Sequence, residues 1–321
     1  MLLHWWRIVI MTLVLQILIL AAGFVLLVKG SDFFVIGASG IAKEFGIPEL
    51  VIGLTIVAMG TSAPEAAVSI AGVLRGSADI SVGNILGSNI MNILVILGLS
   101  CAIFPVAVSK STIRYEIPFT VFVTVVLLLM GLDGNIGRID GIILWVFFIL
   151  YFAYLFYMVK KNPEEYQGEE IKELSVFRTV LLTVAGLVMV VFGSRFAVDS
   201  ASEIARFFGM SERFIGLTIV ALGTSLPELF TSVQAARHGS TDIAIGNIVG
   251  SNIFNILFVL GTSSIILSIP FAQAFVFDSF VALGACVLLF VCALPKRVIG
   301  RVSGILMLLS YTAYFAFIAW Q

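Results

Sequence analysis

The sequence has 321 residues, of which 60% are hydrophobic and only 12% are charged. Soluble domains are nearer half apolar and a quarter charged, so this composition excludes an ordinary soluble protein and indicates an integral membrane protein. The formal net charge of −1 offers no electrostatic basis for binding nucleic acid. The lengths of the apolar stretches favour an all-α membrane protein, since a β-barrel would show short alternating segments.

Ten stretches of the chain are long and apolar enough to cross a bilayer as helices, each of which takes about 20 residues. The first is longer than the apolar part of a signal peptide and lacks a clear cleavage pattern, so we interpret it as a membrane helix. A charged segment around Pro163 predicts a solvated linker, 161–176, between a first half, 1–160, and a second half, 177–321. The predicted spans are 8–28, 49–73, 79–101, 116–132, 140–160, 177–197, 212–236, 242–268, 275–294 and 300–320.

The two halves are copies of each other. Moving residues 30–98 by 163 positions places them on 193–261 without a gap, and Gly87-Ser88-Asn89-Ile90 then meets Gly250-Ser251-Asn252-Ile253. Chance does not keep such a register over this length, so we interpret the blocks as an internal repeat. The repeated cores are predicted at about 49–101 and 212–268.

Lysine and arginine are distributed unequally between the two sides of a ten-helix arrangement. The positive-inside rule places the richer side in the cytoplasm, so both termini are predicted outside and the linker inside. Because five helices per half is an odd number, the second copy is expected to enter the membrane upside down, as in alternating-access carriers. The richer side holds Lys29, Lys43, Lys110, Arg114, Lys160, Lys161, Lys172, Arg178, Arg237, Lys296, Arg297 and Arg301, and the other holds Arg7, Arg75, Arg138, Arg195, Arg206 and Arg213.

A carboxylate recurs inside an apolar stretch in each half. Gly60-Thr61-Ser62-Ala63-Pro64-Glu65 returns as Gly223-Thr224-Ser225-Leu226-Pro227-Glu228. A charge at membrane depth costs several kcal/mol, so such residues usually mark a substrate or ion path. The alternative is a protonated, hydrogen-bonded structural carboxyl. Two copies in duplicated frames favour a single site built from both halves.

The proline of each motif predicts an interrupted helix. Pro64 lacks an amide hydrogen and crowds the carbonyl of Gly60, so the helix must bend or open there. Backbone carbonyls near Ala58 are then expected to face a cavity. The hydroxyls of Thr61 and Ser62 are expected on the same face as the Glu65 carboxylate, although they could simply satisfy the broken helix. The second half repeats the pattern with Ala221, Thr224, Ser225 and Glu228 around Pro227.

The next helix of each half carries a polar stripe at spacing i, i+4, i+8. The two stripes are Asn84, Ser88 and Asn92, and Asn247, Ser251 and Asn255. A set of oxygen atoms without His or Cys suits Ca²⁺, Na⁺ or Mg²⁺ and argues against zinc or copper. The stripes could also be interhelical glue, and Asn84 and Asn247 are as well explained that way as by a supporting role. Asp79 and Asp242 each open a helix and favour N-caps, with a cation vestibule as the alternative.

The paired G-T-S-x-P-E and G-N-x-x-G-S-N-I-x-N blocks resemble the α-repeats of the sodium/calcium exchanger group within the cation/Ca²⁺ antiporter superfamily. The ten-helix plan is similar to the prokaryotic members. The resemblance implies Glu65 and Glu228 as central Ca²⁺ and Na⁺ ligands. It implies further contributions from Thr61, Ser62, Thr224 and Ser225, from carbonyls near Ala58 and Ala221, and from Ser88, Asn92, Ser251 and Asn255. Some prokaryotic relatives carry Asp where this chain has Asn255.

These observations predict an antiporter in the plasma membrane that exports Ca²⁺ with inward Na⁺, without a cofactor or an obligate protein partner other than the lipid bilayer. Two ionised glutamates balance one Ca²⁺, so exchange for three Na⁺ would be electrogenic. A Ca²⁺/H⁺ or K⁺-dependent exchanger is the nearest alternative, and a cation channel is a remote one. An enzyme is not expected, since the chain has no H-E-x-x-H motif and no histidine base at membrane depth.

Overall fold

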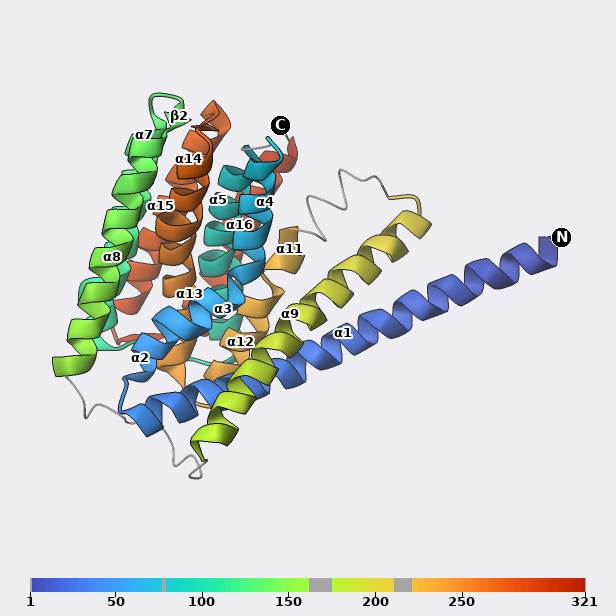
Figure 1. Cartoon of the computed structure of the whole chain (residues 1–321), viewed down its shortest axis with the longest axis horizontal. Helices are drawn as coiled ribbons and strands as arrows, with labels where there is room; N and C mark the ends of the chain where they lie inside the picture. Colours follow the sequence, from blue (N-terminus) through green and yellow to red (C-terminus); the bar gives the residue numbers. More distant parts are fainter. Residues whose placement is uncertain (1, 77–78, 162–174, 211–220, 321) are drawn as a thin grey trace.

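The computed structural model describes residues 2–76, 79–161, 175–210 and 221–320, and this part of the chain is almost entirely helical (Figure 1). In the labels used here, η denotes a π-helical segment. The first half contains α1 (Leu2–Phe45), α2 (Glu49–Ile52), η1 (Gly53–Val57), α3 (Ala58–Thr61), α4 (Ala63–Leu74), α5 (Asp79–Met91), η2 (Asn92–Leu97), α6 (Gly98–Ile103), η3 (Thr112–Glu116), α7 (Ile117–Gly131) and α8 (Arg138–Lys161). The second half contains α9 (Val176–Phe207), α11 (Ala221–Thr224), α12 (Leu226–Arg237), α13 (Thr241–Phe254), η5 (Asn255–Leu260), α14 (Gly261–Ile266), α15 (Gln273–Ala293) and α16 (Arg301–Trp320).

Within the described residues, eight helices are long and apolar enough to cross a membrane, or nine if the bent pair Glu49–Thr61 and Ala63–Leu74 is one span. Part of the predicted span 212–236 lies outside the described residues. Two predicted boundaries were wrong, because the helices predicted at 8–28 and 177–197 continue to Phe45 and Phe207. The polar residues after Val28 do not end the first helix, since the Ser31 hydroxyl bonds back to the Val28 carbonyl at 3.1 Å.

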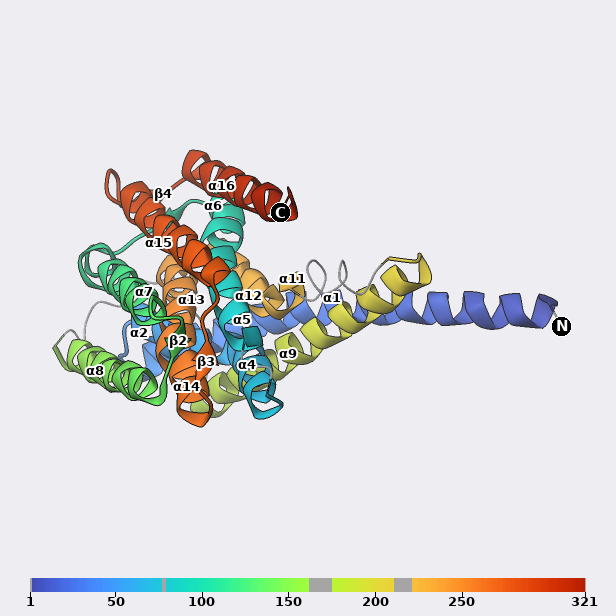
Figure 2. The same ribbon diagram turned by 90° about the horizontal axis from the view of Figure 1, so that it is seen from above.

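The two long helices, α1 and α9, lie side by side and cross the remaining helices obliquely (Figures 1 and 2). Glycines line their contact. A Cβ atom on Gly186 would lie 2.4 Å from the backbone nitrogen of Phe34, and one on Gly30 would lie 2.9 Å from that of Val190. Small residues let helix backbones approach closely where lipid provides no hydrophobic driving force. The pair therefore packs as one unit.

The bend inside the first repeated motif occurs where its proline predicts it. α3 ends at Thr61, and α4 begins at Ala63 with Pro64 in its first turn. The segments Glu49–Thr61 and Ala63–Leu74 are inclined by 49°. Ser62 between them has φ −82° and ψ 5°. In the second half Ser225 has φ −91° and ψ 4° at the start of α12. Both motifs thus place a glutamate in the first turn of a new helix.

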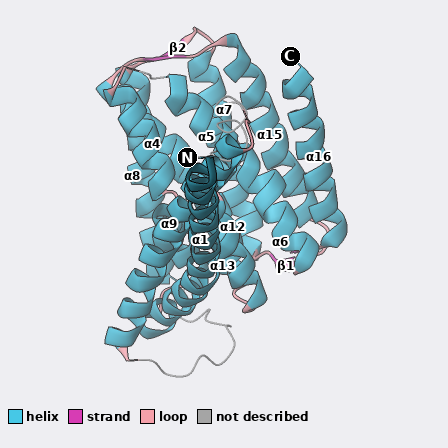
Figure 3. Cartoon of the chain, turned by 90° about the vertical axis from the view of Figure 1, so that its right-hand side faces the viewer, coloured by secondary structure: helices cyan, strands magenta, loops and turns pink. Residues whose placement is uncertain are grey.

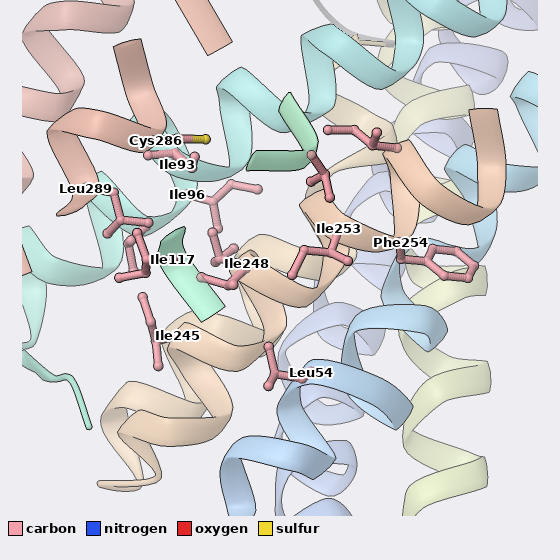
Figure 4. Packing of buried hydrophobic residues seen from close by; sticks show 14 of the residues in the cluster. Leu54, Ile93, Ile96, Ile117, Ile245, Ile248, Ile253, Phe254, Cys286 and Leu289 are labelled. Atoms are coloured by element: carbon pink, nitrogen blue, oxygen red, sulfur yellow. The ribbon is translucent and has the colours of Figure 1, made fainter. Parts of the chain in front are cut away.

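The core consists of helices from both halves. Every residue of α13 from Ile243 to Phe254 is buried, as expected of a helix surrounded by other helices. Side chains of both halves, among them Ile96 of η2 and Ile248 of α13, meet in this core (Figure 4). A Cβ atom on Gly250 would lie 2.7 Å from the Cα atom of Leu54, so α13 touches the bent helix of the other half almost backbone to backbone.

Two short strand pairs join the halves. β1 (Val106–Ala107) pairs with β4 (Val298–Ile299), and β2 (Asn135–Ile136) pairs with β3 (Ile269–Pro270), both antiparallel. The 163-residue shift relates β1 to β3 and β2 to β4, since 106 + 163 = 269 and 135 + 163 = 298. Figure 3 shows β1 and β2 at opposite ends of the helical bundle. The repeat therefore extends beyond the sequence block that revealed it.

Candidate functional site

The two glutamates of the repeated motif are buried in the middle of the molecule. Glu65 lies in the first turn of α4 and Glu228 in the first turn of α12, and each is only 1% exposed. They are near enough for the charge of Glu228 to act on Glu65. The positive end of each helix dipole partly offsets a carboxylate charge in a first turn. Two such charges side by side nevertheless repel each other unless a cation joins them.

Oxygen atoms without hydrogen-bond partners are concentrated around this pair. Buried side-chain oxygens and nitrogens are nearly always hydrogen-bonded, so each exception calls for an explanation such as an ion. In the described part of the chain, six of thirteen such exceptions belong to predicted site residues. They are both carboxylate oxygens of Glu65, Oε2 of Glu228, Oγ of Ser225, and Oδ1 of Asn92 and Asn255.

The helices that carry these atoms are neighbours across the repeat. α4, which carries Glu65, packs against η5, which begins at Asn255. α12, which carries Glu228, packs against η2, which begins at Asn92. Carboxylate, amide and hydroxyl oxygens are the ligands that Ca²⁺ and other hard cations take in proteins. Single π-turns also occur frequently at functional sites, and both amides open one.

The hydroxyls of the motif reach across to the other half. Ser62 donates to Oε1 of Glu228 at 2.8 Å, and the Thr61 hydroxyl lies 2.9 Å from Oδ1 of Asn247. These hydrogen-bond partners thus lie in the other half, across the bend at Ser62, and spacing along one helix did not indicate them. In the opposite direction, Ser225 and Thr224 face the Glu65 carboxyl.

Asn84 and Asn247 each hydrogen-bond to the backbone carbonyl of the glutamate in their own half. Asn84 donates to the Ser69 hydroxyl at 2.9 Å and to the backbone carbonyl of Glu65 at 3.1 Å. Asn247 makes the equivalent bonds to Ser232 at 2.9 Å and to the Glu228 carbonyl at 3.4 Å. Both amides thus hydrogen-bond to the helix turns that carry the glutamates, and the supporting role considered from the sequence stays a prediction.

Of the remaining predicted site residues, Ser251 and Ala58 contact each other across the repeat. Ser251 donates to the Ala58 carbonyl at 3.4 Å, and that carbonyl also accepts from the Ser62 N–H at 3.0 Å. The expected bare carbonyl at Ala58 was wrong, because the helix breaks one turn later and Ser62 still completes the helical bond. Ser88 is buried. Ala221 begins α11, and its side chain lies outside the described residues.

The two aspartates lie at helix starts, away from the glutamates in the chain. Asp242 is in the first turn of α13, but Ser240 occupies the N-cap, so the N-cap prediction was wrong for Asp242. Asp242 instead lines a cavity of about 780 Å³ together with Glu49, Lys110 and Arg297. Asp79 begins α5, and its side chain lies outside the described residues.

The sequence reasoning missed Asn89 and Asn252 as site residues. Each is buried, and each hydrogen-bonds both to the other and to one of the asparagines with an unpartnered oxygen. Their only sequence signal was their identity in the repeat, Gly87-Ser88-Asn89-Ile90 against Gly250-Ser251-Asn252-Ile253.

Fold and site together define a helical membrane protein whose two halves jointly build a buried cluster of oxygen atoms. The model of the family described as "Sodium/calcium exchanger protein" matches residues 15–158 and 178–320. The chain therefore belongs to the sodium/calcium exchanger family, a family of membrane antiporters.

Individual relatives agree with this assignment. "Putative antiporter CaxA" of Alkalimonas amylolytica is 41% identical over 91% of this chain and 95% of its own length. "Sodium/calcium exchanger MaX1" of Methanosarcina acetivorans is 31% identical over 92% of this chain and 96% of its own. A solved structure of the sodium-calcium exchanger NCX_Mj is similar with a TM-score of 0.83, at 35% identity over 95% of this chain and 98% of that one.

Proposed function

We propose that this protein exchanges Na⁺ for Ca²⁺ across the plasma membrane by alternating access and exports Ca²⁺ from the cytoplasm. The observation that carries the proposal is the group of six unpartnered buried oxygens contributed by both halves. Two carboxylates neutralise one Ca²⁺, and the neutral amide and hydroxyl oxygens complete a flexible oxygen shell. The names of the relatives MaX1 and NCX_Mj, both sodium/calcium exchangers, support the choice of ions.

The strand pairs support ten spans. Segments that pair must lie on the same side of the membrane, so an even number of crossings must separate them. Five long helical spans lie between β1 and β4, and three lie between β2 and β3. In both cases the segment that includes α11 and α12 must supply one further crossing. With the bent pair as another span, the total is ten.

The strand pairs also support inversion of the halves. β1 and β3 occupy equivalent positions in the repeat, yet β3 pairs with β2, at the opposite end of the bundle from β1. Equivalent loops on opposite sides are the expected result of an inverted repeat. With the lysine-rich side in the cytoplasm, β1 and β4 are cytoplasmic and both chain termini are extracellular.

The unequal packing of the two long helices supports alternating access. α1 packs against α12, and Asp32 of α1 lies 2.6 Å from His238 just beyond α12. The equivalent helices α9 and α4 make little contact in the described part of the chain. One of the two glutamate-bearing helices is therefore covered by a long helix, and the other is less covered. Exchange of these two arrangements, with α1 and α9 moving as a unit against the core, would expose the site to each side in turn.

The test is radioactive Ca²⁺ uptake into Na⁺-loaded proteoliposomes, with and without an outward Na⁺ gradient. We expect uptake only with the gradient, and we expect Glu65→Gln and Glu228→Gln each to abolish it. An inside-positive potential should accelerate uptake if three Na⁺ leave for each Ca²⁺, since one charge moved through 100 mV corresponds to about 2.3 kcal/mol.

The same assay separates the alternatives. Uptake that survives either glutamine variant would refute the proposed site. Uptake that is indifferent to Na⁺ but driven by a proton gradient would identify a Ca²⁺/H⁺ exchanger, and uptake that also requires K⁺ would identify a K⁺-dependent one. Flux that neither saturates nor couples to a counter-gradient would identify a channel.

A further inference from the structure

Asn89 and Asn252, which are equivalent in the repeat, form a reciprocal pair at the interface of α5 and α13. The Asn89 amide nitrogen donates to the backbone carbonyl of Asn252 at 3.2 Å, and the Asn252 amide nitrogen donates to that of Asn89 at 3.1 Å. Both side chains are at most 4% exposed. A backbone carbonyl can only accept, so each of these two amides must turn its NH₂ group toward the other helix.

The orientation of this pair determines that of a second pair. With its nitrogen engaged, Asn89 presents Oδ1, which accepts from the amide nitrogen of Asn255 at 3.1 Å. Oδ1 of Asn252 likewise accepts from the amide nitrogen of Asn92 at 3.0 Å. The second pair must therefore direct its own Oδ1 atoms the other way. Those are two of the unpartnered oxygens of the site.

We propose that Asn89 and Asn252 are positioning residues that fix, crosswise between the halves, which end of the ion-facing amides meets the cation. Asn89 orients Asn255, and Asn252 orients Asn92. An amide turned by half a revolution would present its NH₂ hydrogens to a cation instead of an oxygen. Residues that orient ligands in this way typically change metal affinity by roughly 10- to 100-fold when they are replaced.

The proposal rests on the proposed function insofar as Ca²⁺ is the ligand. It explains why the chain uses an amide, not a hydroxyl or an apolar side chain, at two positions that face each other and not the ion. It also assigns a reason to the pairing itself. Neither half can orient its own ion-facing amide, so the site is complete only when both repeats are assembled.

The test compares Asn89→Leu in three backgrounds by equilibrium binding of radioactive Ca²⁺ to the purified full-length protein. In the parent, we expect the half-saturating Ca²⁺ concentration to rise roughly 10- to 100-fold. In the Asn255→Asp background we expect little further change, because a carboxylate presents oxygen at both ends and needs no orientation. In the Asn92→Asp background the full loss should remain, since Asn92 takes its orientation from Asn252.

The repeat provides a mirror experiment. Asn252→Leu should be rescued by Asn92→Asp and not by Asn255→Asp. In proteoliposomes, the unrescued variants should show a raised half-saturating Ca²⁺ concentration with a much smaller change in maximal rate. Alanine at the same positions serves wherever a leucine variant fails to fold, and the same crosswise pattern is required of it.

The outcomes separate the possible failures. Equal losses in all three backgrounds would show that Asn89 only packs α5 against α13, and equal rescue by both aspartates would show a general effect of added charge. Either result overturns the positioning role. Crosswise rescue in a protein whose Ca²⁺ transport ignores Na⁺ would uphold the positioning role and refute the proposed coupling. A parent that does not bind Ca²⁺ would refute both.

Discussion

Ser62 and Ser225 occupy equivalent positions but differ in their bonding. Ser62 donates to Glu228 at 2.8 Å, whereas the Ser225 hydroxyl has no hydrogen-bond partner in the described part of the chain. Hydrogen bonds to charged groups contribute about 1.5–3 kcal/mol, and their loss leaves a buried acceptor unsatisfied. The two serines should therefore contribute unequally to the stability of the ion-free protein.

We expect Ser62→Ala to lower the stability of the ion-free protein by about 1.5–3 kcal/mol. Ser225→Ala is the matched control, and it should change that stability less, because the Ser225 hydroxyl makes no bond as well formed as that of Ser62 in the described part of the chain. Thermal unfolding in detergent with a Ca²⁺ chelator measures both variants. Equal losses would contradict the crosswise bond between Ser62 and Glu228.

At the residue scale, the buried carboxylates of the candidate site could be identified from the sequence, but the hydrogen-bond partners of its residues could not. The carboxylates Glu65 and Glu228 stand out because a charge is costly in an apolar stretch. Spacing along one helix identifies neighbours only while the helix is continuous, so it assigned Ser62 to Glu65. The roles of Asn89 and Asn252 depend on contacts between segments separated by 163 residues, and no local pattern reports those.

At the scale of elements, the seam between α1 and α9 depends on the absence of side chains. A Cβ atom on Gly186 would lie 2.4 Å from the Phe34 nitrogen and 2.7 Å from the Gly30 carbonyl oxygen. Because both atoms belong to the backbone, no rotamer change relieves the clash. The two helices would have to separate.

Gly186→Ala should therefore destabilise the protein by about 1–3 kcal/mol, the usual range for overpacking. Gly284→Ala on α15 is the control, since nothing lies within 4 Å of a Cβ atom there. Thermal unfolding should show a lower midpoint for the first variant and an unchanged or slightly higher one for the second. A tolerated alanine at 186 would show that the seam is looser than these distances indicate.

The contact between α1 and α12 includes an Asp–His pair that the repeat does not reproduce. Asp32 pairs with His238 at 2.6 Å, with side chains 27% and 38% exposed. A shift of 163 residues relates Asp32 to Arg195 and Arg75 to His238, so the equivalent contact would bring two arginines together. The arrangement in which α1 contacts α12 should therefore be favoured over the one in which α9 contacts α4.

Asp32→Asn should loosen the end of α12. Partly exposed polar pairs of this kind contribute up to about 1 kcal/mol, so amide hydrogen exchange around His238 should accelerate by up to about fivefold. Glu203→Gln is the control, because it removes an ion pair that lies within α9 alone. Unchanged exchange in the Asp32 variant would show that the pair does not hold the contact.

The boundaries of these elements were harder to predict than their existence. The apolar stretches identified most of the long helices, since about 20 apolar residues suffice to span a bilayer. The first helix was predicted to span 8–28. The helix continues to Phe45. Glycines between Val28 and Phe45 pack against α9, and Asp32 finds a partner in His238 of the other half.

At the scale of the whole molecule, the strand pairs lead to a prediction about sidedness. The ten spans that we propose from the strand pairs, together with a lysine-rich side in the cytoplasm, put the C-terminus outside. Alkaline phosphatase fused after residue 321 should be active in a bacterial host, and the same enzyme inserted in the linker at 162–174 should be inactive. An inactive C-terminal fusion would contradict the crossing supplied by the segment with α11 and α12.

The same strand pairs constrain the order of assembly during synthesis. β1 is made early, but its partner β4 lies in the last loop, and β2 must also wait for β3. The early half therefore carries unpaired strand edges until the ribosome has nearly finished. Unpaired edges invite association with other chains. Nascent protein truncated before the last loop should accordingly be a target for chaperones and proteases.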